Sequence, residues 1–377
     1  MVNYIQGAIR EAIGKGKALM SKIPGSRTLG AHFASLANFA NNEIKEIIDY
    51  LDTLLVDTEY SDPKNLKSKF SRFKNASGML SKIENVVIAA MSRKSPDDDF
   101  VNKLVQEICS EINYPLPPPV ASCLSQKYYH IYPDYGLICI PLLESEFVLH
   151  IPDLYHELGH PLIELANPKV EAFQTNLGYF NLTVKKHFDE EIKRREINKL
   201  DTGVFDPIYI YKDSWLQKWS VEFFCDLYAT YMLGPAYLWS NLHMCTKMSW
   251  DLCKTPTHEI TTHPAGDARM RCCLIALEQI GFKEEAKQIK LKWDEFMKII
   301  GQKPSSEYFI AFPEKILKSA AEFCLTGVMQ IGCQVASPSN SDKVNRLLND
   351  SWKEFWKNPQ TFYEWEKKTV AEFKSTL

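Results

Sequence analysis

Two histidines, His156 and His160, stand four positions apart, and Glu157 directly follows the first. In a helix this spacing puts both imidazoles on one face, where they can bind a single metal ion. Imidazole nitrogens bind zinc at about 2.0–2.1 Å, and a catalytic zinc keeps one position open for water. Glu157 is placed to take a proton from that water as it attacks a carbonyl. The pattern predicts a metal-dependent hydrolytic site in which the two histidines are ligands and Glu157 is the general base.

An ordinary surface helix that happens to carry two histidines would show the same spacing. The motif therefore needs a third ligand elsewhere in the chain, because catalytic zinc usually has three protein ligands.

That third ligand is predicted on a helix spanning residues 214–233, which is apolar almost all round yet carries Glu222 and Asp226 on one face. Burying two unpaired carboxylates costs several kcal/mol, and a nearby cation removes this cost. We expect Glu222 to bind the metal and Asp226 to accept the other N–H of a ligand imidazole. The alternative is that both carboxylates pair with lysine or arginine. Weaker candidates for the third ligand are Glu164, Glu171 and His187.

Attack on a peptide carbonyl builds negative charge on its oxygen, which needs a hydrogen-bond donor besides the metal. His263, in a polar turn between two apolar helices, is the favoured donor, and we therefore include it with Glu157 among the catalytic candidates. An ordinary loop histidine is an equally good reading of that position. Tyr237 and Tyr231 are further possible oxyanion or substrate contacts. Arg269 can anchor a substrate carboxylate, although a structural pair with a buried carboxylate is the favoured role.

An HExxH helix followed by ExxxD on a later helix resembles the gluzincins, the zincin metallopeptidases whose third zinc ligand is a glutamate. The resemblance implies a Zn²⁺ cofactor, a peptide or protein substrate, and a zincin-like core. It also implies one role for each matching position: His156, His160 and Glu222 as zinc ligands, Glu157 as general base, and Asp226 as the group that orients a ligand histidine. The flanking helices match no characterised family that would specify the substrate.

Two further readings stay open. One is a catalytically inactive zincin-fold protein that binds partners as a scaffold. The other is a metal-dependent hydrolase of a non-peptide substrate, because HExxH determines how water is activated but not which bond is broken.

The composition is that of a globular protein: 377 residues, of which 45% are hydrophobic and 12% aromatic. The net charge of −3 gives no reason to expect nucleic acid as a partner. Ten cysteines without a CxxC pair indicate free thiols rather than a zinc ribbon. Since there is no run of eighteen apolar residues and no secretory signal pattern, we expect no membrane span and a cytoplasmic location.

The elements that must position the site suggest a mainly α (α+β) fold. A proline run at 115–119 separates a helical N-terminal region, 1–114, from a zincin-like domain, 120–300. A helical C-terminal region, 301–377, would pack on that core. A small antiparallel or mixed sheet is expected beside the HExxH helix. Its strands are predicted at 128–131, 136–141 and 147–150, and further helices at 1–23, 30–58, 63–91, 96–112, 183–199, 284–300, 307–335 and 342–377.

Overall fold

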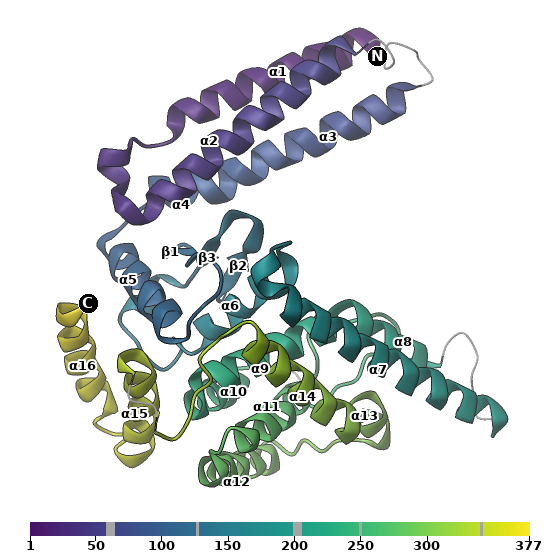
Figure 1. Ribbon diagram of the computed structural model, residues 1–377, viewed down its shortest axis with the longest axis vertical. Helices are drawn as coiled ribbons and strands as arrows, with labels where there is room; N and C mark the ends of the chain where they lie inside the picture. The colour runs from purple at the N-terminus through teal and green to yellow at the C-terminus, as the bar shows by residue number, and fades with distance from the viewer. Residues whose placement is uncertain (58–64, 126–127, 199–205, 249–250, 340–341) are drawn as a thin grey trace. The chain divides into compact units, whose positions relative to one another are not determined.

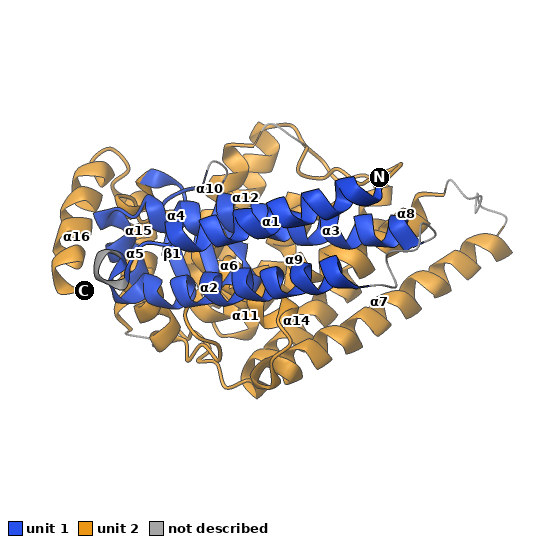
Figure 2. Ribbon diagram, turned by 90° about the horizontal axis from the view of Figure 1, so that it is seen from above, with its two compact units in different colours: residues 1–102, 119–142 blue, residues 103–118, 143–377 orange. Residues whose placement is uncertain are grey.

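The computed structural model describes residues 1–57, 65–125, 128–198, 206–248, 251–339 and 342–377. These residues are mainly helical, with one small mixed sheet (Figure 1), which confirms the coarse fold class. The chain forms two compact units, shown in different colours in Figure 2. The first comprises residues 1–102 and 119–142, and the second comprises 103–118 and 143–377.

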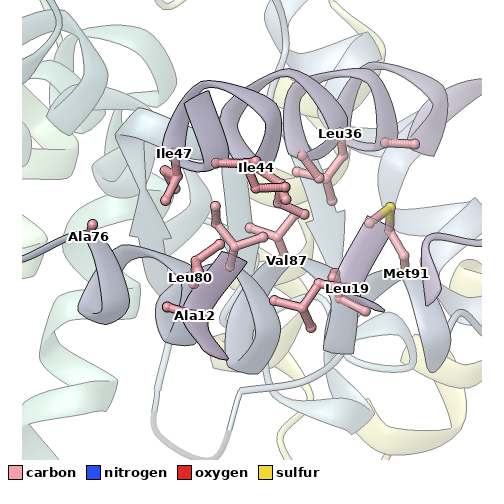
Figure 3. Close-up of a cluster of buried hydrophobic side chains, with 14 of the residues drawn as sticks. Ala12, Leu19, Leu36, Ile44, Ile47, Ala76, Leu80, Val87 and Met91 are labelled. Carbon is pink, nitrogen blue, oxygen red and sulfur yellow. The ribbon is translucent and has the colours of Figure 1, made fainter. Parts of the chain in front are cut away.

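The first unit contains three long helices that pack side by side (Figures 1 and 2). Their order is α1 (Val2–Lys22), α2 (Ser26–Val56) and α3 (Leu66–Lys82), which continues through a π-helical segment, η3 (Ile83–Ile88), into α4 (Ala89–Ser92). The helices predicted at 1–23, 30–58 and 63–91 are therefore present, although residues 58 and 63–64 lie outside the described residues. Apolar side chains at helical spacing meet in one buried cluster, in which Figure 3 labels Ile44, Leu80 and Val87. Burying each such side chain contributes roughly 1.5–3 kcal/mol.

The sheet also belongs to the first unit. Its order is β1–β3–β2, with β1 (Val120–Ser122) parallel and β2 (His130–Tyr132) antiparallel to the central β3 (Leu137–Cys139). The strand expected at 147–150 was wrong, because the backbone N–H of Val148 donates to the Glu366 carboxylate rather than to a strand. The third strand is β1, directly after the proline run. The position of this sheet beside the HExxH helix stays a prediction, since that helix lies in the second unit.

The start of α5 (Pro96–Glu111) holds β1 by side-chain hydrogen bonds. Asp98 accepts from the backbone N–H groups of Ser95 and Cys123, both at 2.6 Å. The amide of Asn102 pairs with both backbone groups of Ala121, accepting at 2.9 Å and donating at 2.7 Å. The outer edge of β1 is thus paired by a side chain, which keeps it from pairing with another strand.

The second unit is almost wholly helical. The 3₁₀ segment η4 (Pro133–Tyr135) still lies in the first unit, between β2 and β3, and η5 (Leu142–Ser145) begins at the boundary of the two units. After it, the second unit contains in chain order α6 (Asp153–Glu164), η6 (Pro168–Val170), α7 (Glu171–Ile197), α8 (Pro207–Ser214), η7 (Trp215–Trp219), α9 (Ser220–Leu233), α10 (Pro235–Thr246), α11 (Gly266–Gln279), α12 (Lys283–Ile299), α13 (Ser306–Ala311), α14 (Glu314–Gln330), α15 (Lys343–Lys357) and α16 (Phe362–Thr376). Prolines divide two of the predicted helices. The helix expected over 307–335 breaks at Pro313, and the one over 342–377 breaks near Pro359, because proline lacks the N–H that continues a helix.

Helix α9 lies at the centre of this unit and packs against α6, α11 and α14 (Figure 1). All of its residues except Val221 and Glu222 are buried, which explains why its sequence is apolar nearly all round. It approaches α6 closely at Gly159, where a Cβ atom would stand 3.0 Å from the Cα of Cys225 and 3.1 Å from its sulfur. Glycine suits this approach because any side chain would press on the α9 backbone. His156 and His160, one turn apart on α6, flank the contact.

Candidate metal centre

His156 lies on α6 between two carboxylates of α9 and is 9% exposed. Its Nδ1 is 2.8 Å from Oδ1 of Asp226, and its Nε2 is 3.6 Å from Oε2 of Glu222. The ionised Asp226 places the ring proton on Nδ1, which leaves the lone pair of Nε2 directed toward Glu222. Imidazoles that bind a metal through one nitrogen usually donate the N–H of the other nitrogen to a carboxylate or another acceptor in this way.

Asp226 is fully buried and accepts hydrogen bonds from three sides. Arg269 donates through Nε at 2.6 Å and Nη2 at 2.5 Å, and the Tyr237 hydroxyl donates at 2.5 Å. Burial alone would raise the pKa of Asp226, but the Arg269 guanidinium and the contact with His156 lower it well below its usual range. Asp226 is therefore ionised. Arg269 takes the structural role favoured from the sequence, and the Tyr237 hydroxyl points at this carboxylate.

Glu222 presents an oxygen that the surrounding protein does not satisfy. Its Oε2 is buried and has no hydrogen-bond partner among the described residues. The nearest polar neighbours are Nε2 of His156 at 3.6 Å and Nε2 of His263 at 3.7 Å. A tetrahedral zinc with bonds of about 2.0–2.1 Å holds adjacent ligand atoms about 3.3–3.5 Å apart. Since buried polar atoms are rarely left unpaired, this geometry fits a divalent cation between Glu222 and His156.

His160, on the next turn of α6, faces Cys225 of α9. Its Nδ1 is 3.1 Å from Oε1 of Glu164, so Nε2 is the nitrogen left for a metal. Burial lowers the pKa of His160, but the Cys225 thiol and the Glu164 and Glu157 carboxylates together raise it overall. Glu157 itself is 8% exposed.

Within the described ranges, one set of three potential ligands has all its donor atoms within 4.8 Å of one another: His156, His160 and Cys225. Glu222 is not in this set, although it contacts His156. Cys225 was not among the ligands predicted from the sequence, where it was interpreted as a buried free thiol. The spacing of Cys225 could have identified it as a candidate ligand, because a residue three positions after Glu222 shares its helix face.

The remaining predicted residues are distributed between the site and the surrounding core. His263 lies in the loop between α10 and α11 with its side chain 65% exposed, at the edge of the site beside Glu222. Burial lowers the pKa of His263, and the Glu222 carboxylate opposes this shift. Tyr231 is not brought to the site as an oxyanion donor, because its hydroxyl lies 2.7 Å from both Oε1 of Gln279 and the carbonyl oxygen of Ala321. The weaker ligand candidates Glu171 and His187 lie on α7.

Comparisons with protein-family models, with curated proteins and with solved structures find no match to this chain. Among the helices of the described ranges, none is both long enough and apolar enough to cross a membrane.

Proposed function

We propose that this chain is a zinc-dependent metallopeptidase in which His156, His160 and Glu222 bind the metal and Glu157 is the general base. One observation carries the proposal: the unpartnered, buried Oε2 of Glu222 lies 3.6 Å from the Nε2 of His156, whose other nitrogen is fixed by Asp226. A structural ion pair would have given that oxygen a hydrogen bond. The HExxH spacing on α6 and the ExxxD spacing on α9 support the same assignment.

The chemistry follows from the positions of the side chains. A zinc ion at this centre would supply a Lewis acid that polarises the scissile carbonyl and lowers the pKa of water. Glu157 accepts the proton of the attacking water and passes it to the departing amine. His263, exposed at the edge of the site and with a lowered pKa, donates a neutral imidazole N–H to the developing oxyanion.

Two buried groups hold the site without touching the reacting atoms. Arg269 and Tyr237 both donate to Asp226, and Asp226 in turn holds the Nδ1 proton of His156. This chain of contacts keeps the Nε2 lone pair of His156 available for a metal.

The decisive test is Glu157→Gln assayed on a peptide library after zinc loading. We expect the variant to retain about one zinc per chain and to lose roughly 10²–10⁴-fold in hydrolysis, the usual contribution of a general base. Glu171→Gln is the control, because Glu171 is exposed at the start of α7 and does not lie on the HExxH helix. It should keep most of the activity.

Two results would count against the proposal. Undiminished hydrolysis by the Glu157→Gln variant would remove Glu157 as the base. Wild-type protein that binds zinc but cleaves no peptide in the library would favour the scaffold or a non-peptide substrate.

A further inference from the structure

The thiol of Cys225 lies at a close approach of the two site helices. On α9, Cys225 lies one turn after Glu222 on the same face, and it stands opposite Gly159 of α6. A Cβ atom at position 159 would come within 3.1 Å of the Cys225 sulfur. The missing side chain of Gly159 therefore makes room for the thiol between the two HExxH histidines.

Two other buried thiols of this unit have a different environment. The Sγ of Cys272 lies 3.6 Å from the carbonyl oxygen of Leu317, and that of Cys324 lies 3.7 Å from the carbonyl oxygen of Phe224. Both are ordinary weak donors to the backbone. Cys225 instead has donor atoms of both His156 and His160 within 4.8 Å of its sulfur.

We propose that the Cys225 thiolate binds the metal ion directly, together with His156 and His160. The inference rests on the proposed function, because it needs a metal at this centre. The thiol proton leaves to solvent when the metal binds, and no oxidant or reductant is involved. With Glu222 also bound, the ion has four protein ligands, which is the closed arrangement of structural zinc sites. Water then reaches the ion only when one of the two α9 ligands withdraws.

X-ray absorption of the zinc-loaded full chain tests this without any mutation. Zinc–sulfur bonds measure about 2.3 Å, and bonds to nitrogen or oxygen about 2.0–2.2 Å, so a single sulfur neighbour is resolved. We expect one sulfur at that distance in wild type and its loss in Cys225→Ser. Cys272→Ser is the matched control, since it removes a thiol that is equally buried but bonded to a carbonyl. Cobalt-loaded protein should show a thiolate-to-cobalt absorption band in the near ultraviolet with the same dependence on Cys225.

The outcomes separate this inference from the proposed function. About one zinc per chain with only nitrogen and oxygen neighbours would overturn the thiolate ligand and leave the site of His156, His160 and Glu222 standing. Failure of wild type to bind zinc would overturn both. A sulfur neighbour that persists in Cys225→Ser would assign the sulfur to another cysteine and overturn the inference. If Cys225→Ser does not fold by circular dichroism, the wild-type spectrum alone decides.

Discussion

The two units bury carboxylates in opposite ways. In the first unit Asp98, 2% exposed, is satisfied by local groups: it accepts from the N–H and hydroxyl of Ser95 and from the N–H of Cys123. In the second unit Asp226 needs a guanidinium, a phenol and an imidazole from three other helices, and Glu222 leaves one oxygen without a partner.

This difference separates a structural carboxylate from one that suits a ligand. A carboxylate that caps a helix and holds a strand has its hydrogen bonds satisfied by neutral groups of these two elements, and nothing more is required of it. A carboxylate that is buried, aimed at an imidazole and unpartnered carries a free-energy cost of about 1–3 kcal/mol or more. Such a cost in a native structure calls for a ligand that offsets it.

The largest expected effect on stability comes from Asp226→Ala, which tests the role of the fully partnered carboxylate. The change leaves the Arg269 guanidinium buried without its partner, and a broken buried ion pair destabilises by about 3–5 kcal/mol. Urea unfolding of the metal-free protein measures this loss. The double variant Asp226→Ala/Arg269→Met should be less destabilised than the single variant, because it leaves no buried charge. Equal losses in the two variants would show that the pair is not the source of the effect.

A second prediction concerns the contact between α6 and α9. Gly159→Ala places a methyl group 3.0 Å from the Cα of Cys225, where the backbone cannot move aside without separating the helices. We expect a loss of about 1–3 kcal/mol, as for other overpacked cores. Gly178→Ala on the exposed face of α7 is the control, since a Cβ there meets nothing within 4 Å. That change should stabilise by up to about 1 kcal/mol. If both alanine variants were more stable than wild type, or both less stable, the packing argument would be contradicted.

Glu222→Gln sharpens the contrast between the two α9 carboxylates. Its Oε2 has no hydrogen bond to lose, so we expect the metal-free protein to change in unfolding free energy by less than about 1 kcal/mol. The same variant should bind zinc more weakly, because an amide is a poorer ligand than a carboxylate. Zinc content after dialysis and urea unfolding of the metal-free protein measure the two effects. A large destabilisation without metal would mean that Glu222 is a structural residue like Asp98.

Much of the site's framework could be predicted from the sequence. The helices were found because their apolar residues recur at helical spacing, and α9 stood out because Glu222 and Asp226 interrupt an otherwise apolar helix. The short strands were harder to predict from the sequence. β1 is held by the side chain of Asn102 and by β3, and no local sequence pattern reveals these contacts. Cys225 was missed for a similar reason: its sulfur matters only because Gly159, sixty-odd positions earlier, lets α6 approach it.

The smallest predicted effect concerns His243, a half-buried histidine on α10. The ring of His243 stacks on His150 and packs edge-on against Trp352. Burial, with smaller contributions from Lys247 and His150, lowers the pKa of His243 from 6.5 to about 4. The unfolded chain therefore binds more protons between these values, so the stability due to neutral His243 is full above about pH 6.5 and falls as the pH drops toward 4.

Urea unfolding at about pH 7 and about pH 5 should show this slope in wild type, and His243→Gln should reduce it. The ring is only partly buried, so we expect the reduction to be well below the nominal 1.36 kcal/mol per pKa unit. An unchanged slope in His243→Gln would show that another group titrates in this range. The partial burial of the His243 imidazole would then contribute little to the pH dependence of stability.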